Sequence, residues 1–308
     1  MITTVTLNPM LDKTVYVDSI LKGRIQRASR VESAVGGKGV NVSRQLKMLG
    51  CNTRATGFLG GEIGTMLERL LSLEGIQHDF VRIAGVTREG ITYREADGSV
   101  TAVFEPPHGV SRDDAGRLVE HCRRLIDQST WVVFSGSSPC AEADDVYSDL
   151  VSYARDNNVH TVVDSYGKAF REAMEAVPTF VKLNKDEYEQ TFGKKLERES
   201  DYRPALEVFV TRGINYCVIT DGNRPLYAAS EEGEWKLVPP EVTTINSTGS
   251  GDSMIAGLIY GLGKGWGFER CLTFGAAAGA ANAQKWQVAN SSLEEITVLE
   301  SKVLLHEF

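Results

Sequence analysis

The sequence predicts an α/β fold whose largely parallel sheet is covered by helices on both faces. Past Pro107, short apolar segments alternate with longer helical patterns, and we expect strands at 131–134, 161–163, 180–183 and 216–219. Strands buried on both faces have this composition because the helices that connect them pack on both sides of the sheet. With 308 residues, of which 42% are hydrophobic, the chain can bury a substantial core without disulfide or metal support.

The same patterns predict the elements around these strands. Helices over 113–126 and 144–155 precede the first two strands of the series. Nearer the N-terminus, the spacing of apolar residues predicts a strand over 2–7, a helix over 39–49 that stops at Gly50, a strand over 53–59 and a helix over 65–73. From Gly251 onward we expect the chain to be nearly all helical.

Two segments, at about 12–35 and 86–105, do not follow this rhythm. They alternate polar and apolar residues, which indicates strands with one exposed face, and Asp97-Gly98 is a strong hairpin signal. We therefore predict a single domain over 1–308 into which a small antiparallel sheet is inserted. A small sheet that projects from a larger body would cover a cleft as a lid or form a dimer contact.

Charge and cysteine content exclude several functions. The 33 basic and 41 acidic residues give a formal net charge of −8, which argues against a nucleic-acid-binding face. No segment resembles a signal peptide or reaches the roughly 20 apolar residues that span a bilayer, so we expect a cytoplasmic protein with no membrane partner. The five cysteines are far apart and are expected to be reduced thiols; they are Cys51, Cys122, Cys140, Cys217 and Cys271.

The strongest functional signal is Gly249-Ser250-Gly251-Asp252, which opens an apolar helical run. The glycines let backbone N–H groups approach an anion, and the helix N-terminus adds positive potential. A carboxylate there would repel a phosphate, but it makes sense as a base that takes a proton from an attacking hydroxyl during phosphoryl transfer. The alternative is a glycine-rich turn in which Asp252 is an ordinary helix-start residue.

Two further motifs precede predicted helices. Gly36-Gly37-Lys38-Gly39-Val40-Asn41 matches neither a Walker A loop nor a dinucleotide fingerprint, and it suits a polar small-molecule site or simply a tight turn. In Lys182-Leu183-Asn184-Lys185-Asp186-Glu187, the spacing puts Asn184 and Glu187 on one face of the first helical turn, at the end of a strand. Glu187 would hold Mg²⁺ through water there, although a solvated helix start gives the same pattern.

Together with Thr6-Leu7-Asn8-Pro9-Met10-Leu11-Asp12 and Ser135-Gly136-Ser137-Ser138-Pro139, these motifs resemble the signature of the PfkB (ribokinase-like) sugar kinases. The likeness covers essentially the whole chain and is strongest to the branch of 1-phosphofructokinase and tagatose-6-phosphate kinase. It implies a ribokinase-like three-layer α/β/α sandwich with a small β-sheet lid. It also implies ATP and Mg²⁺ as cofactors, a sugar phosphate as substrate and a homodimer formed through the lid.

The resemblance also implies roles for individual residues. Asp252 would be the catalytic base, and the amides of Gly249, Ser250 and Gly251 would form the anion hole. The sugar hydroxyls would be held by Asp12, Gly37, Asn41 and Ser137, and the existing phosphate by Arg88 and Lys38, with Arg24 or Arg27 of the lid reaching the same phosphate. ATP and Mg²⁺ would be served by Lys182, Asn184, Glu187, Thr220, Gly222, Thr248 and Asn282.

The sequence departs from the family pattern at four places, namely Ser138, Leu183, Glu89-Gly90 and Thr220-Asp221-Gly222. The base and anion hole are intact, but the change at Glu89-Gly90 leaves the exact substrate open. The leading hypothesis is therefore ATP-dependent phosphorylation of fructose 1-phosphate, fructose 6-phosphate or tagatose 6-phosphate to a 1,6-bisphosphate. The alternatives are a ribokinase-like kinase of an unphosphorylated sugar or nucleoside, and a non-catalytic sugar-phosphate sensor.

Overall fold

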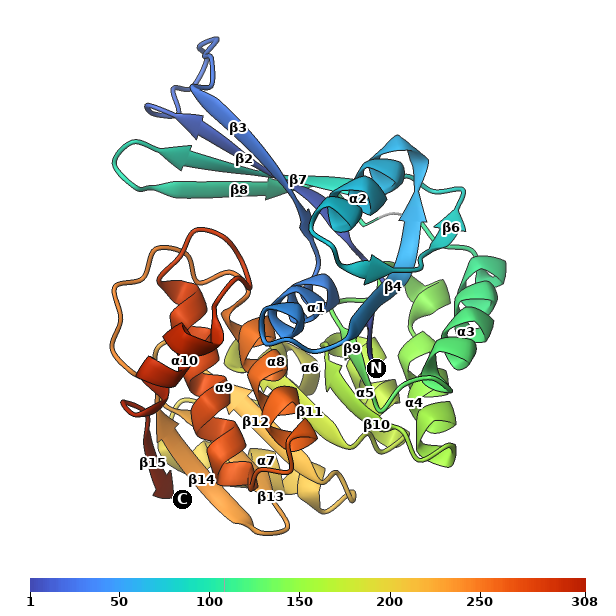
Figure 1. Ribbon diagram of the computed structural model, residues 1–308, viewed down its shortest axis with the longest axis vertical. Coiled ribbons are helices and arrows are strands. Elements are labelled where there is room, and N and C mark those ends of the chain that lie inside the picture. The colour runs from blue at the N-terminus through green and yellow to red at the C-terminus, as the bar shows by residue number, and fades with distance from the viewer. Residues whose placement is uncertain (108) are drawn as a thin grey trace.

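The central sheet of the protein is built from short strands rich in Val, Ile and Phe, a composition that suits burial on both faces. The computed structural model describes residues 1–107 and 109–308, which form an 11-stranded sheet and a separate 4-stranded sheet (Figure 1). The strands of the large sheet are β1 (Ile2–Thr6), β4 (Thr53–Gly60), β5 (Gln77–His78), β6 (Val81–Ile83), β9 (Trp131–Ser135), β10 (His160–Asp164), β11 (Phe180–Asn184), β12 (Tyr216–Thr220), β13 (Leu226–Ser230), β14 (Gly233–Val238) and β15 (Leu304–Glu307). Their order is β15-β14-β13-β12-β11-β10-β9-β1-β4-β5, and β6 also pairs with β4.

Helices cover both faces of this sheet, as predicted. They are α1 (Lys38–Met48), α2 (Gly61–Leu73), α3 (Arg112–Ile126), α4 (Val146–Asp156), α5 (Gly167–Glu175), α6 (Lys185–Phe192), α7 (Tyr202–Val210), α8 (Ser250–Gly263), α9 (Phe268–Ala283) and α10 (Leu293–Glu300), with short 3₁₀ turns η1 (Ala141–Ala143) and η2 (Glu199–Asp201). Side chains of β9 alternate between two cores: Val132 and Phe134 pack with α3 to α7, whereas Trp131 and Val133 pack with α1, α8, α9 and α10. The three-layer α/β/α prediction is therefore confirmed.

The direction of the strands follows from their connections. From β5 and β6 through β12 all neighbouring pairs are parallel, because a helix separates most consecutive strands, whereas β13, β14 and β15 are added antiparallel at one edge. The prediction of an almost wholly helical C-terminus was incomplete, because β15 follows α10 and closes that edge. Short strands with mixed composition give little period-2 signal.

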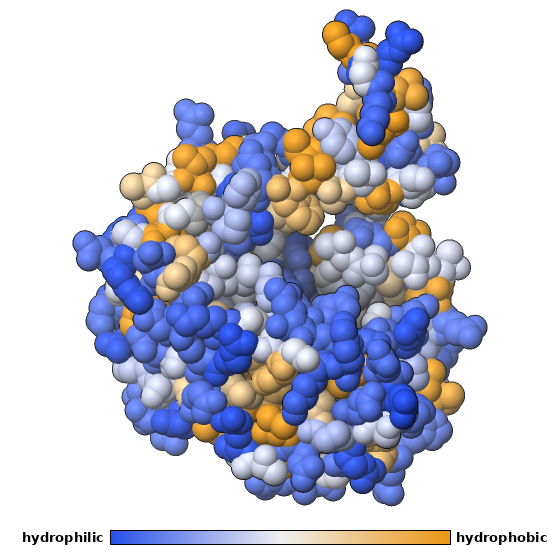
Figure 2. All heavy atoms as spheres, turned by 180° about the vertical axis from the view of Figure 1, so that it is seen from behind, coloured by the Kyte–Doolittle hydropathy of each residue, from blue (hydrophilic) through white to orange (hydrophobic). Residues whose placement is uncertain are grey.

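The small sheet contains β2 (Met10–Val17), β3 (Arg30–Gly36), β7 (Arg88–Glu95) and β8 (Val100–Phe104), in the order β3-β2-β7-β8. Two hairpins form it, but they meet along β2 and β7, which are parallel. The prediction of an antiparallel sheet is therefore wrong for the central pair, since the chain enters both hairpins from the same side. Figure 2 shows the small sheet projecting from the body, with the surface hollowed where the two meet.

Two further observations concern the whole described chain. All five cysteines are free. Among residues 1–107 and 109–308, no helix is both long and apolar enough to cross a membrane.

Candidate active site

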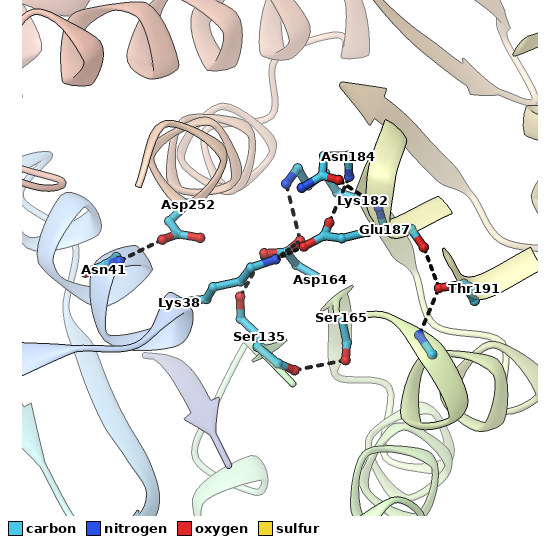
Figure 3. A network of polar contacts seen from close by, with 12 residues as sticks. Lys38, Asn41, Ser135, Asp164, Ser165, Lys182, Asn184, Glu187, Thr191 and Asp252 are labelled. Carbon is cyan, nitrogen blue, oxygen red and sulfur yellow. Dashed lines mark hydrogen bonds and ion pairs between the residues drawn. The ribbon is translucent and has the colours of Figure 1, made fainter. Parts of the chain in front are cut away.

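The candidate site lies where the carboxyl ends of β9, β10 and β11 meet. Ser135, Asp164 and Asn184 are the last residues of these parallel strands, so the fold places them side by side at one edge of the sheet. The N-termini of α1 and α8 contribute Lys38 and Asp252 to the same place (Figure 3).

Asp164 is the centre of this polar network. Its side chain is completely buried, and its Oδ1 lies 3.3 Å from the Nζ atoms of both Lys38 and Lys182. The hydroxyl of Ser135 donates to Oδ2 at 3.1 Å. Burial alone would raise the pKa of Asp164, but the two ammonium groups outweigh it and hold the pKa below its ordinary value. Asp164 is therefore an ionised anchor for two cations.

Glu187 joins this network and also begins a helix. The backbone N–H of Glu187 donates to Asn184 Oδ1 and the N–H of Asn184 donates to Glu187 Oε2, both at 2.8 Å, which is a reciprocal cap of α6. Glu187 Oε1 pairs with the ammonium of Lys38. Burial opposes the charge on Lys38, but Asp164, Glu187 and Asp252 together raise its pKa above the ordinary value. The ammonium of Lys38 thus lies among carboxylates.

The glycine-rich turn before α8 combines three sources of positive potential. Gly249 is the N-cap with φ of 78°, a left-handed conformation that favours glycine, and no side chain caps the helix. The first N–H groups of a helix lack partners within it and carry the positive end of its dipole. A Cβ on Gly251 would lie 2.7 Å from Lys182 Nζ, so this ammonium rests against the turn itself. The turn has the physical properties of an anion site.

Asp252 lies in the first turn of α8 and is only 5% exposed. Its Oδ2 accepts a hydrogen bond of 2.8 Å from Asn41 Nδ2. Burial, reinforced by the negative charge of Asp164, raises the pKa of Asp252 to about 6, although Lys38, Asn41 and Lys182 act in the opposite direction. A carboxyl group with this pKa is ionised at neutral pH and still takes up a proton readily.

A cleft of about 590 Å³ opens beside the turn, a size that suits a small-molecule ligand. Of the residues predicted for nucleotide binding, Lys182, Asn184, Thr220 and Gly222 line it together with Ser250 and Gly251. Asn282 is buried, and its amide donates to Thr248 O at 2.8 Å and to Ser250 Oγ at 3.1 Å. Asn282 therefore holds the glycine-rich turn through Ser250 Oγ and the backbone carbonyl of Thr248.

Two of the predicted sugar-binding residues, Asp12 and Arg88, lie near the starts of β2 and β7, at the base of the small sheet. Asp12 Oδ1 and Arg88 Nε are buried without a hydrogen-bond partner in the part of the chain that the structure describes. Burial raises the pKa of Asp12, against the pull of Arg44, and lowers the pKa of Arg88. Buried polar atoms in folded proteins almost always have a hydrogen-bond partner, so these two atoms are suited to bind a polar ligand.

The remaining predicted residues of this side have defined partners. Ser137 Oγ accepts from Asn8 Nδ2 at 3.3 Å, and Asn41 accepts from Arg44 Nη1 at 2.8 Å while donating to Asp252. Gly37 has φ of 134°, and a Cβ there would lie 2.9 Å from Thr6 Cγ2, so the close approach of α1 to β1 requires glycine. Arg24 and Arg27 are exposed in the connection between β2 and β3.

Sequence reasoning missed Asp164, Ser135 and Asn8 as site residues. Asp164 had a usable signal, since it is the first charged residue after the apolar strand at 161–163, at an edge where ligands bind. Asn8 has a buried Oδ1 without a partner among the described residues, as Asp12 does, so it is a further polar group open to a ligand here.

A buried carboxyl beside a helix N-terminus that suits an anion, in a three-layer α/β/α body, is the arrangement expected of a phosphotransferase that uses an alcohol group as acceptor. The comparisons with known proteins give the particular family. The chain belongs to the pfkB family of carbohydrate kinases, whose model matches residues 6–296. Membership of this family implies ATP as the phosphoryl donor.

Similar proteins cover nearly the whole chain. It is 30% identical to the 1-phosphofructokinase of Escherichia coli K12 over 307 residues, which is 100% of this chain and 98% of the relative. It is 29% identical to the tagatose-6-phosphate kinase of Staphylococcus epidermidis over 298 residues, 96% of each protein. A possible 1-phosphofructokinase of Thermotoga maritima has a TM-score of 0.91 and 27% identity, covering 100% of this chain and 99% of that chain. A ribokinase of the same organism, at 18% identity and a TM-score of 0.76, shares the fold.

Proposed function

We propose that this kinase transfers the γ-phosphoryl group of ATP to a phosphorylated ketohexose, namely fructose 1-phosphate, fructose 6-phosphate or tagatose 6-phosphate, and forms a 1,6-bisphosphate. The observation that carries the proposal is the buried carboxyl of Asp252, held by Asn41 at the start of α8 and next to the turn on which Lys182 rests. The names of the similar proteins support a phosphosugar as the acceptor.

In this proposal Asp252 is the catalytic base. The sugar hydroxyl oxygen forms a bond to the γ-phosphorus, the bond between that phosphorus and the oxygen of the departing ADP breaks, and the hydroxyl proton passes to Asp252. The pKa of about 6 supports this role, because the carboxyl is mostly ionised at neutral pH yet more basic than an exposed aspartate. The hydrogen bond from Asn41 fixes which oxygen stays available.

Charge stabilisation falls to the turn before α8. We propose that the amides of Gly249–Gly251 and the ammonium of Lys182 hold the oxygens of the phosphoryl group in transit. Phosphoryl transfer needs mainly positioning and stabilisation of negative charge, which a helix N-terminus with an adjacent lysine supplies. An ion pair of 3.3 Å between Lys182 Nζ and Asp164 Oδ1 keeps this ammonium beside the turn.

The sugar is assigned to the other side of Asp252. Asp12, Gly37, Asn41 and Ser137 would meet its hydroxyls, and Arg88 its phosphate. Support comes from the unpartnered atoms Asp12 Oδ1 and Arg88 Nε in the described chain, which a hydroxyl and a phosphate oxygen would satisfy. Lys38, also proposed for the phosphate, lies at Asp164 and Glu187 and would have to exchange one of these partners.

Mg²⁺ fits the carboxylates of the site. Among the described residues no group of three or more His, Cys, Asp or Glu side chains that could hold a metal ion is assembled; the carboxylates of Asp186 and Asp221 line the cleft, and Glu187 follows Asp186 in the chain. A hard ion that keeps several waters and binds chiefly to phosphates needs only such donors, and Glu187 would hold it through water. When bound, Mg²⁺ would neutralise part of the charge on the nucleotide phosphates.

A homodimer formed through the small sheet is also part of the proposal. Val31, Val100, Val103 and Phe104 of β3 and β8 are each more than half exposed, which is unusual for large apolar side chains. Among the similar structures, phosphofructokinase-2 of E. coli is described in a tetrameric form. Sedimentation velocity of the wild-type protein and of Val103→Glu measures the association state; a Val103→Glu protein that remains the same size contradicts this interface.

A substrate screen tests the proposed reaction. ADP release is measured by a coupled assay with ATP and each of the three hexose phosphates, and with fructose, tagatose, ribose and adenosine as unphosphorylated controls. We expect turnover with at least one hexose phosphate and little with the controls. Turnover of unphosphorylated acceptors alone would make the chain a ribokinase-like enzyme, and ligand binding without any ADP release would make it a sensor.

A further inference from the structure

The small sheet also contacts the body of the protein at a place that lies away from the proposed chemistry. Tyr16 of β2 and Arg94 of β7 are direct neighbours across the parallel pair. The guanidinium carbon of Arg94 lies 4.1 Å from the ring centre of Trp286, and the rings of Tyr16 and Trp286 are 6.4 Å apart. We call these three residues the Trp286 contact. It joins the small sheet to the connection between α9 and α10, which lies on the side of the body that faces this sheet (Figure 1).

The contact is held from both sides. Tyr16 donates its hydroxyl proton to Glu32 Oε2 at 2.6 Å, and the guanidinium of Arg30 lies 5.3 Å from the Tyr16 ring, so the ring is fixed within the small sheet. On the body side, Trp286 O accepts a hydrogen bond of 3.0 Å from Asn246 Nδ2. A cation over an indole face is the most favourable geometry of its kind.

The segment 284–290 that carries Trp286 also packs on the glycine-rich turn. A Cβ added to Gly249 would collide with Val288 Cγ1, so Val288 lies directly over the N-cap of α8. Asn282 Oδ1 accepts from the Ala289 N–H at 2.6 Å while its amide holds Thr248 and Ser250. Ala289 is fully buried with φ of 55°, a left-handed conformation that a non-glycine residue adopts only when its surroundings impose it.

The connection from the small sheet to the anion site is therefore short and continuous. Asn246 is the shared member: its side chain donates to Trp286 O, and its Oδ1 accepts from the Thr248 N–H at 3.0 Å. A displacement of the small sheet that moves Arg94 would pull on Trp286 and thereby on residues 246–250. Packed, hydrogen-bonded contacts of this kind transmit a displacement because they resist gradual deformation.

We propose that Trp286 is a positioning residue that couples the two substrate sites, so that a sugar phosphate bound at the base of the small sheet orders the turn that receives the phosphoryl group. This inference rests on the proposed function, since it takes the amides of Gly249–Gly251 as the phosphate site. Trp286 itself touches neither substrate in this scheme. Binding of the two substrates is then mutually favourable, and each raises the affinity of the other by the same factor.

The first test needs no ligand and no turnover. Hydrogen–deuterium exchange is measured on the whole protein as wild type, Arg94→Met, Trp286→Leu and Trp286→Phe. The matched control is Arg270→Met, which removes a cation from the face of Trp266, where the guanidinium lies 3.7 Å from the ring centre on the opposite end of α9. We expect Arg94→Met and Trp286→Leu to speed exchange at residues 246–250 and 284–290 by about two- to fivefold, the scale of one exposed cation–π contact. Trp286→Phe should stay near wild type, and Arg270→Met should leave these amides unchanged.

The second test measures the coupling directly. The dissociation constant of the non-hydrolysable ATP analogue AMP-PNP is determined by calorimetry with and without whichever hexose phosphate is turned over in the screen. We expect the ratio of the two constants to exceed one in the wild type, to fall toward one in Arg94→Met and Trp286→Leu, and to be retained in Trp286→Phe and Arg270→Met. In steady-state kinetics, the two coupling-deficient variants should show raised KM values for both substrates with a smaller change in kcat.

The outcomes separate this inference from the proposed function. Unchanged exchange at residues 246–250 in both Arg94→Met and Trp286→Leu, or an unchanged coupling ratio in these variants, overturns it. Should Trp286→Leu fold poorly, Arg94→Met decides, because the Arg94 side chain is only partly buried. Failure of the proposed function would appear in the substrate screen, whereas the exchange experiment gives its result whichever acceptor the enzyme uses.

Discussion

The two sides of the site differ in how far their polar groups are already satisfied. On the nucleotide side, Asp164 holds Lys38 and Lys182, and Glu187 and Asn184 cap each other, so the charges form a closed network. On the small-sheet side, Asp12 Oδ1 and Arg88 Nε have no partner among the described residues. A closed network keeps its geometry without a ligand, whereas unpaired groups pay a desolvation cost that a ligand relieves. In the proposed function, the first side stabilises charge and the second recognises the sugar phosphate.

The largest expected effect comes from removing the base between the two sides. Asp252→Asn keeps the shape and the contact with Asn41 but removes the proton acceptor, so kcat should fall by about 10³-fold or more, at the upper end of the range for general-base catalysis. AMP-PNP affinity, measured by calorimetry, should change little. Near-normal turnover in this variant would remove Asp252 from its proposed role.

Breaking the closed network should cost stability. Asp164→Asn leaves the buried ammonium of Lys182 and the partly exposed ammonium of Lys38 with one fewer negative partner, and loss of one member of a buried ion pair costs about 3–5 kcal/mol. The measurement is the free energy of unfolding from urea titrations at pH 7. Asp221→Asn is the control, because its pair with Lys185 is partly exposed at 4.0 Å and should contribute less than about 1 kcal/mol. Equal losses of unfolding free energy in Asp164→Asn and Asp221→Asn would contradict the difference between the buried and the partly exposed ion pair.

Removing a recognition group should act on one substrate only. Arg88→Met should raise the KM for the hexose phosphate about 10- to 100-fold, the range for a charged hydrogen bond, and leave the affinity for AMP-PNP unchanged. Arg82→Met, which removes an exposed partner of Glu68, is the matched control. A similar KM for hexose phosphate in Arg88→Met and wild type would show that the phosphate binds elsewhere.

The smallest expected effect is a shift in the pH dependence of kcat, which reports the interaction between Asp164 and Asp252. Activity should fall as the pH drops below about 6, because Asp252 becomes protonated and can no longer act as base. Asp164 raises this pKa, so the acid limb of the kcat profile should move to lower pH in any Asp164→Asn protein that remains folded. An unmoved limb would mean that the two carboxylates do not interact.

Stability has the opposite dependence on the same group. The folded state holds the proton of Asp252 more tightly than the unfolded chain, where the pKa has its ordinary value of 3.8. Between that value and about 6 the folded protein binds more protons, so the contribution of Asp252 to the free energy of unfolding falls as the pH rises. Between pH 3.8 and about 6, activity is therefore expected to increase with pH, whereas the contribution of Asp252 to the free energy of unfolding decreases.

The sequence predicted the layers well, because buried parallel strands and amphipathic helices leave strong periodic patterns. The strand at 131–134 was found to within one residue as Trp131–Ser135. It predicted the small sheet less well, because the pairing of β2 with β7 joins two distant hairpins, and no local pattern states their relative direction. The relative direction of two strands this far apart in the chain is decided by packing and not by the local sequence.

The candidate site shows the same limit. Glycine and aspartate at the start of α8 are a local signal, and the structure brings the predicted Asp252 and Asn41 within 2.8 Å. Asp164 was missed because its importance comes from two lysines that lie 126 and 18 residues away in the chain. Asn282 stays a prediction for the nucleotide; its hydrogen bond to Thr248 O in the glycine-rich turn depends on a contact that no linear pattern reveals.

With Asp252 as the proposed base, its burial would also limit the hydrolysis of ATP when no sugar is bound. Water is the smallest possible acceptor, and a base open to solvent would activate it and waste the nucleotide. Asp252 is only 5% exposed and one of its oxygens accepts a hydrogen bond from Asn41, so water has little room beside this carboxyl. A low rate of ATP hydrolysis would then follow from the fold itself, before any acceptor sugar binds.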